Sequence, residues 1–256
     1  MQIKQVRNAT LLIEFGGSRF LIDPYLADKD ANPGFEGTVN SHIRNPRVEL
    51  KTPMDEILNV DAVIVTHTHP DHWDEAAIRL VPKDVPLFAQ HEKDADLIRS
   101  QGFTDVRILQ DGARFGAVEL IKTPGLHGSP ETVAVAYEVL GDVCGVVFKS
   151  PGEKTLYVAG DTIWNDDVAT TLKTHAPEVV VLNAGDAQIP GLGSIIMGTE
   201  DIKQVHEAAP SATLIASHLE TVNHSVLSRA ELRAFVREHR LETQVLVPDD
   251  NQSYTF

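Results

Sequence analysis

Short apolar runs closed by turn residues constrain the fold of this 256-residue chain more than any other feature. They are rich in β-branched residues and bounded by Gly, Pro or Asp, a pattern that predicts strands. Residues 9–15 and 18–23 flank Gly16-Gly17, which predicts a β-hairpin. The other expected strands cover residues 61–67, 85–89, 105–109, 117–123, 132–140, 144–150, 154–160, 178–185, 212–218 and 243–248.

Helical patterns lie between these runs. The clearest spans residues 228–240, where Ser228 and Glu231 form a capping box ahead of an apolar stripe. Hairpins and strand–helix alternation together favour two packed β-sheets with helices outside, an α/β or α+β sandwich. Because no linker divides the chain, we expect one domain over residues 1–256. The other expected helices cover residues 74–81, 92–102, 166–176 and 199–209.

The charge and the composition exclude several classes of partner. The formal net charge is -15, and no stripe of Lys and Arg is present to replace phosphate counterions, so nucleic acid is not expected as a partner. No run reaches the ~20 apolar residues that span a bilayer, and the start lacks a signal-peptide pattern. The only cysteine, Cys144, predicts a buried core thiol. We expect a cytoplasmic protein without a membrane partner; a homo-oligomer is compatible with the sequence.

Residues 24–58 form a polar segment with four prolines and no clear periodicity. Segments of this length without regular structure often carry binding residues. We therefore expect this segment to determine selectivity. Asp23, directly before it, either orients a ligand histidine or is a turn residue at a strand end.

A cluster of metal-ligand residue types follows the apolar run 61–66. His67, His69, Asp71 and His72 lie within six positions, and the intervening proline forces a turn that directs alternate side chains to one point. Imidazole and carboxylate groups are good ligands for zinc, manganese or iron. The spacing therefore predicts a metal site rather than four unrelated polar residues.

Three further candidate ligands occupy equivalent places later in the chain. His127, Asp161 and His218 each follow an expected strand. Strand ends on one edge of a sheet converge in space, so all seven side chains are expected to meet. Any one of these histidines alone would more often be an ordinary core or surface residue; the ordered set makes coincidence a poor explanation.

This ordered set resembles the metallo-β-lactamase superfamily, whose His-x-His-x-Asp-His signature is present at residues 67–72. The resemblance covers nearly the whole chain and implies an αββα sandwich, a four-layer fold with a metal site at one sheet edge. It implies one or two divalent ions, with Zn²⁺ or Mn²⁺ favoured. The implied ligands are His67, His69 and His127 for the first metal, Asp71, His72 and His218 for the second, and Asp161 as the bridge.

Several residues are candidates for contact with the substrate. Glu220, Asn223 and His224 follow the last ligand and are expected to line the substrate side, with a polar turn as the alternative. His42 and Arg44 are candidates for binding an anionic group, with a solvated loop as the alternative. Asp71 is also a candidate for orienting the nucleophile or carrying its proton, and the sequence does not separate ligand from base.

The expected activity is metal-dependent hydrolysis of a small molecule. The opening hairpin and the stretch 217–224 most resemble the branch that contains ascorbate 6-phosphate lactonase, which favours a lactone or phosphoester and admits an anionic substrate. The sequence does not distinguish a lactone substrate from a phosphodiester. The alternatives are an iron-dependent oxidoreductase on the same scaffold and a sensor without enzymatic activity; the identity of the metal discriminates between hydrolase and oxidoreductase.

Overall fold

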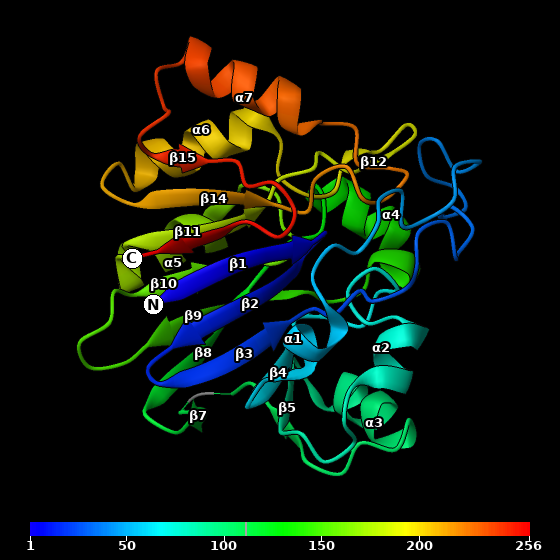
Figure 1. Cartoon of the computed structure of the whole chain (residues 1–256). Helices are drawn as coiled ribbons and strands as arrows, with labels where there is room; N and C mark the ends of the chain where they lie inside the picture. Colours follow the sequence, from blue (N-terminus) through cyan, green and yellow to red (C-terminus); the bar gives the residue numbers. More distant parts are fainter. Residues whose placement is uncertain (111) are drawn as a thin grey trace.

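Two seven-stranded β-sheets form the centre of the molecule (Figure 1). The computed structural model describes residues 1–110 and 112–256. In order across the first sheet lie β16 (Ser253–Thr255), β1 (Gln2–Arg7), β2 (Thr10–Phe15), β3 (Ser18–Ile22), β4 (Ala62–Val65), β5 (Leu87–Ala89) and β6 (Val106–Ile108). In order across the second lie β15 (Val245–Leu246), β14 (Thr213–Ser217), β11 (Val179–Asn183), β10 (Leu156–Val158), β9 (Cys144–Lys149), β8 (Val118–Pro124) and β7 (Arg114–Phe115).

Helices cover the outer face of each sheet, which completes the expected αββα sandwich (Figure 1). The first sheet packs against α1 (Met54–Leu58), α2 (Glu75–Leu80) and α3 (Glu92–Ser100). The second packs against α5 (Asp166–His175), α6 (Thr199–Ala208) and α7 (Arg229–Glu238). Beside the second sheet, α4 (Pro130–Leu140) packs on a small hairpin formed by β12 (Gln188–Ile189) and β13 (Gly193–Ser194).

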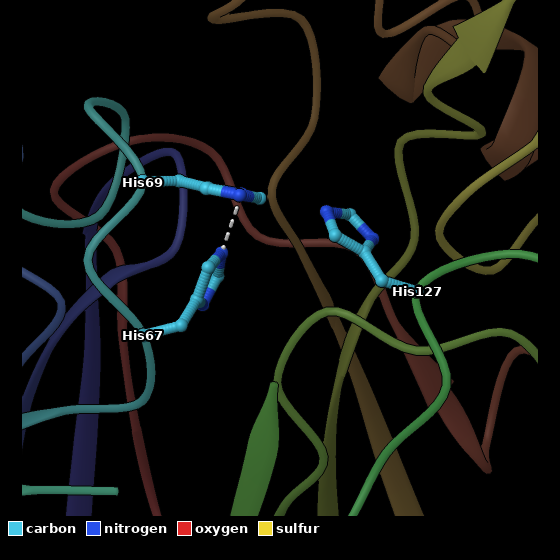
Figure 2. A group of neighbouring side chains, drawn as sticks. All are labelled: His67, His69 and His127. Carbon is cyan, nitrogen blue, oxygen red and sulfur yellow. Dashed lines mark hydrogen bonds between the residues drawn. The ribbon is translucent and has the colours of Figure 1, made fainter. Parts of the chain in front are cut away.

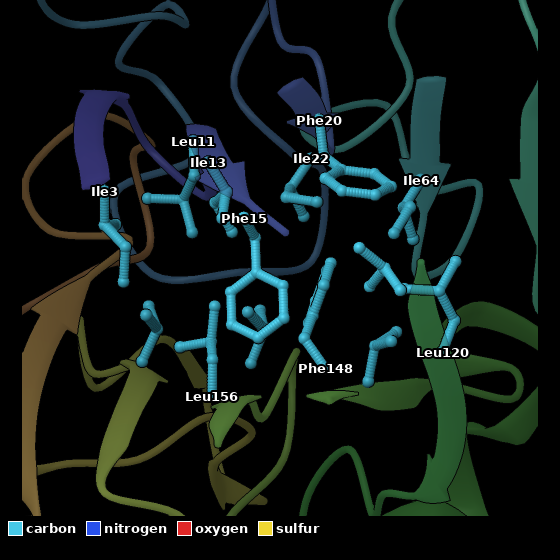
Figure 3. Close-up of a cluster of buried hydrophobic side chains, with 14 of the residues drawn as sticks. Ile3, Leu11, Ile13, Phe15, Phe20, Ile22, Ile64, Leu120, Phe148 and Leu156 are labelled. Atoms are coloured by element: carbon cyan, nitrogen blue, oxygen red, sulfur yellow. The ribbon is translucent and has the colours of Figure 1, made fainter. Parts of the chain in front are cut away.

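The main core lies between the two sheets and draws on both halves of the chain (Figure 3). Side chains alternate as the pleat requires: in β11, Val179 and Val181 point into this core, whereas Val180 points toward the helices. Phe148 meets Phe20 edge to face, with ring centroids 5.4 Å apart. Cys144 is part of the same core, as expected. Burial raises the pKa of its thiol.

The hairpin expected at Gly16-Gly17 is confirmed. These residues have φ of 56° and 78°, which suits the two central positions of the tight turn that joins β2 to β3. The capping box of α7 is also confirmed, because the Ser228 side chain accepts from the Glu231 N–H while the Glu231 carboxylate accepts from the Ser228 N–H.

One expected strand was wrong. Residues 132–140 belong to α4, which begins at Ser129 as N-cap with Pro130 in the first turn. The alternating apolar pattern suggested a buried strand, yet Val135 is 75% exposed and Val139 71%. The alternating pattern therefore does not mark the buried face of a strand. The helix-start residues Ser129 and Pro130 determine the local structure instead.

Six further elements were not predicted. The charged and polar residues of β1, β16 and α1 obscure any apolar period, and β7, β12 and β13 have only two residues each. The other expected strands and helices are present, with ends shifted by a few residues. Within the described part of the chain, no helix combines the length and the apolar character needed to cross a bilayer.

Candidate metal centre

The seven candidate ligands converge at one edge of the sandwich because their strands end there. β10 and β14 both run parallel to β11 between them, while β8 and β10 run the same way because each is antiparallel to β9. Ligands therefore follow the carboxyl ends of four strands drawn from both sheets. They are His67, His69, Asp71 and His72 after β4, His127 after β8, Asp161 after β10 and His218 after β14.

Three imidazoles, those of His67, His69 and His127, form the first group (Figure 2). His69 Nε2 lies 3.0 Å from the carbonyl oxygen of Val139, and His127 Nδ1 lies 2.8 Å from that of Ile195. A carbonyl only accepts, so both outer nitrogens carry hydrogen and the inner ones present lone pairs. His67 Nε2 is only 3.0 Å from His69 Nδ1. Lone pairs that converge in this way repel one another unless a cation lies among them.

Asp71, His72 and His218 form the second group. His218 Nε2 lies 3.1 Å from Asp71 Oδ2, and Asn8 Nδ2 lies 3.3 Å from the same nitrogen. His72 donates from Nδ1 to Asp23 over 2.9 Å, while its Nε2 is buried and has no hydrogen-bond partner among the described residues. An unpartnered buried nitrogen that faces two carboxylates is the kind of atom a metal would satisfy.

Asp161 lies between the two groups. Its Oδ2 is 3.2 Å from His72 Nε2, 3.7 Å from His127 Nε2 and 3.8 Å from His218 Nε2. Asn183 donates to Oδ1 over 2.7 Å and so holds the other oxygen toward the histidines. Asp161 would therefore contact a cation held by either group. Asn183 is a supporting residue that the sequence did not reveal.

Backbone conformation helps to place these ligands. Gly160 has φ of 70°, and a Cβ there would lie 2.3 Å from the carbonyl oxygen of Cys144, so only glycine lets β10 turn directly into Asp161. His218 itself has φ of 58°, an uncommon conformation for a residue other than glycine. Such strain typically persists where surrounding contacts hold a functional side chain in place.

The protonation states suit a cation. Burial alone would raise the pKa of Asp71 and Asp161, but the neighbouring His72 and His218 outweigh it and hold both pKa values below the usual range. Burial lowers the pKa of His127 to about 4. Burial and the neighbouring histidines also lower the pKa of His67, so the first group presents neutral imidazole. Burial opposes the charged form of His72 and His218, but Asp161 and the other nearby carboxylates outweigh it and raise the pKa of both, so those two rings give up a proton when a metal takes its place. Imidazole and carboxylate together form the donor set that zinc, manganese or iron accepts.

Asp23 orients His72, so a substitution at Asp23 tests whether the cluster binds metal. One oxygen accepts from His72 Nδ1, and both accept from Thr66, at 2.7 Å from its N and from its Oγ1. Asp23 has φ of 43°, which asparagine tolerates, so Asp23→Asn should fold normally. The amide cannot satisfy every donor, so we expect a 10- to 100-fold loss of metal affinity, roughly as for other partners of metal-bound histidines.

Titration of the purified variant with zinc or manganese would measure that loss. Asp61→Asn is the matched control, because it makes the same change at an exposed carboxylate that accepts from the Arg19 N–H and touches none of the candidate ligands. An Asp23→Asn protein that bound metal as tightly as the unmodified protein would show that His72 needs no orientation by this carboxylate.

Three of the five candidate substrate residues lie away from the metal cluster. Arg44 is exposed, and its guanidinium donates to the carbonyl oxygens of Asp30 and Ala31. His42 is exposed on the same segment. Glu220 accepts from the backbone N–H of Arg229 and forms an ion pair with its guanidinium over 2.8 Å. None of the three lines the cavity at the metal cluster.

Asn223 is buried and holds the 24–58 segment in place rather than facing the cavity. Its Oδ1 accepts from the Phe35 N–H over 3.0 Å and from Asn45 Nδ2 over 2.8 Å. Its Nδ2 donates to Thr38 Oγ1 and to the Val39 carbonyl oxygen. The structure therefore gives Asn223 a positioning role for this segment.

A cavity of about 170 Å³ opens beside the cluster, and His224 lines it together with four of the candidate ligands. The segment at 24–58 supplies Phe35, Glu36 and Thr38 to its wall. Sequence reasoning missed the apolar residues of the wall, because they lie on a loop, on α4 and around the β12–β13 hairpin. They are Phe35, Pro70, Val139, Leu140, Ile189 and Ile195.

Comparison with known proteins agrees with this geometry. Residues 18–219 match the Beta-lactamase superfamily domain. The chain is 48% identical over 257 residues to the UPF0173 protein YddR of Bacillus subtilis (strain 168), with all of both chains covered. It is 26% identical over 254 residues to a UPF0173 metal-dependent hydrolase of Pelotomaculum thermopropionicum, covering 98% of this chain and 99% of that one.

A solved structure is similar over the same length. The isothiocyanate hydrolase from Delia radicum gut bacteria is 49% identical, with a TM-score of 0.97, and the match covers 100% of this chain and 99% of that one. The fold and the histidine–aspartate cluster define a metallo-hydrolase of αββα architecture. The chain belongs to the β-lactamase superfamily, within its UPF0173 metal-dependent hydrolases.

Proposed function

We propose that this metal-dependent hydrolase acts on small neutral electrophiles, and on isothiocyanates in particular. The observation that carries the proposal is the chemistry of the cavity. Among the described residues of its wall there is no Lys or Arg, the majority of those outside the metal cluster are apolar, and Glu36 adds a carboxylate. Such a wall repels a phosphate and accepts an uncharged group. The related isothiocyanate hydrolase supports the substrate class.

The proposal departs from the phosphorylated substrate that the sequence suggested. His42 and Arg44 were the residues expected to bind an anion, and neither lines the cavity. A lactone, being neutral, remains compatible with the wall, whereas a phosphodiester is disfavoured. The volume of about 170 Å³ favours a compact substrate.

We also propose that the cluster holds one or two Zn²⁺ or Mn²⁺ ions, with Asp161 as the bridging ligand. When bound, such ions make hydroxide available near neutral pH and stabilise developing negative charge. Asp71 is ionised, so it can accept a proton or a hydrogen bond but cannot donate one. Elemental analysis of the purified protein would check the metal; iron alone would favour the oxidoreductase alternative.

The proposed substrate is an isothiocyanate, R–N=C=S. The oxygen of water bonds to the central carbon, the electron pair of the C=N double bond moves onto nitrogen, and nitrogen takes a proton from the water. In the resulting monothiocarbamic acid R–NH–C(=S)–OH, the hydroxyl proton moves to nitrogen, the C–N bond breaks with its electron pair staying on nitrogen, and the O–H pair forms the new C=O bond. The products are the amine R–NH₂ and carbonyl sulfide. No oxidant or further co-reactant is needed, so the step is compatible with a hydrolytic site.

A substrate panel tests the proposal. We expect an alkyl or aryl isothiocyanate to be hydrolysed with a kcat/KM at least about tenfold above that of a lactone or a phosphodiester, which corresponds to about 1.4 kcal/mol of discrimination. Glu36→Lys should reduce the ratio of kcat/KM for the neutral isothiocyanate to kcat/KM for the anionic phosphodiester. Glu36→Gln should reduce the same ratio by less. A marked preference of the unmodified protein for phosphodiesters would overturn the proposal.

A further inference from the structure

His224 presents an unsatisfied imidazole to the cavity at the metal cluster. The residue is 7% exposed and lines the cavity with Asp71 and Asp161. Within residues 1–110 and 112–256 neither ring nitrogen has a hydrogen-bond partner, and Nδ1 is completely enclosed. Because Nδ1 is enclosed, Nε2 is the ring nitrogen that a molecule in the cavity can reach.

The ring is held in place without using its nitrogens. Phe35 meets it edge to face, with centroids 5.2 Å apart and an interplanar angle of 90°. The backbone N–H of Phe35 is bonded to Asn223, and the carbonyl oxygen of His224 accepts from the Gln188 N–H over 3.0 Å. The imidazole is thus oriented by packing and backbone contacts, and its Nε2 stays available for a ligand.

The free nitrogen that faces the cavity is Nε2, and it carries the hydrogen. Buried N–H groups without a partner are rarer than unsatisfied acceptors, so the enclosed Nδ1 is better assigned the lone pair. Burial lowers the pKa of His224 to about 4, which leaves the ring neutral near pH 7. His224 therefore offers the cavity a neutral N–H donor.

We propose that His224 donates its Nε2–H to the substrate nitrogen and stabilises the negative charge that develops there. The inference rests on the proposed isothiocyanate activity. The nitrogen carries the R group, and R fits the apolar wall that includes Phe35, so the atom next to His224 is this nitrogen rather than sulfur. As the C–O bond forms and the C=N pair moves onto nitrogen, a donor fixed at this point lowers the barrier.

Two variants separate this role from a structural one. His224→Phe keeps an aromatic ring and removes the donor, whereas His224→Gln keeps an N–H donor. We expect His224→Phe to leave metal content and melting temperature unchanged. Its kcat should fall by about 100- to 1,000-fold, as for loss of an oxyanion donor, whereas its KM should change by only a few-fold. His224→Gln should recover at least a tenth of the lost rate.

A series of para-substituted aryl isothiocyanates gives a readout that packing would not change. Without the donor, the aryl ring must stabilise more charge on nitrogen, so the dependence of log kcat on the substituent constant should become steeper in His224→Phe. An unchanged slope and rate would overturn the role of His224, and loss of metal would make it a ligand instead. If the unmodified protein hydrolyses no isothiocyanate, the proposed function itself fails, together with this role.

Discussion

Asp161→Ala is expected to remove bound metal and to reduce turnover at least about 100-fold, beyond the range seen when only a partner of a ligand is lost. Oδ2 of Asp161 lies within 3.2 to 3.9 Å of four histidine nitrogens from both ligand groups. Its loss therefore weakens both positions at once. Elemental analysis and steady-state kinetics of the same preparation would measure the two effects together.

A matched control for this variant is Asp105→Ala. Asp105 is also a carboxylate beside a strand, but its side chain is 38% exposed and pairs with Arg107 over 2.7 Å. Its replacement should leave metal content and turnover unchanged, because exposed ion pairs contribute little. If Asp161→Ala retained full metal and full activity, the assignment of seven ligands would be incorrect.

Arg7→Met is expected to lower the free energy of unfolding by about 3 kcal/mol. Arg7 is fully buried and donates to the carbonyl oxygens of Val48, Tyr25 and Ala27, over 3.1, 2.7 and 2.8 Å. Methionine fills much of the volume but leaves these acceptors unpaired; relief from burying the guanidinium offsets part of the cost. Urea unfolding followed by circular dichroism would measure the change.

Arg44→Met provides the comparison within the same segment. Arg44 also donates to two backbone carbonyls of residues 24–58, but its side chain is exposed, so water can replace it. We expect a change of about 0.5 kcal/mol or less. Equal losses in the two variants would show that burial does not determine what these bonds contribute. Because residues 24–58 line the cavity, Arg7→Met should also raise KM.

The convergence of the candidate metal ligands could be predicted because their spacing is local. His67, His69, Asp71 and His72 lie within six positions after a strand, and a strand end followed by a turn brings such side chains together whatever surrounds them. Predicting the later candidates also required the assumption that strand ends on one edge of a sheet converge. The structure confirms that assumption, because β8, β10 and β14 all end beside the cluster.

The substrate side could not be predicted in the same way. Asn223 and Glu220 have the polarity of binding residues, but their partners Phe35, Asn45 and Arg229 occupy them. The pairings of Asn223 join positions 178 and 188 residues apart, so no local pattern reveals them. Of these three candidates only His224 lines the cavity, and its Nε2 has no hydrogen-bond partner among the described residues.

The sequence by itself determined the layered architecture and the donor set, because side-chain periodicity and ligand spacing depend on neighbours along the chain. Tertiary structure decided that residues 132–140 form a helix with Val135 and Val139 exposed, and that the cavity wall is apolar. Those features depend on which surfaces α4 and residues 24–58 meet, and such contacts between distant segments are set by packing in three dimensions.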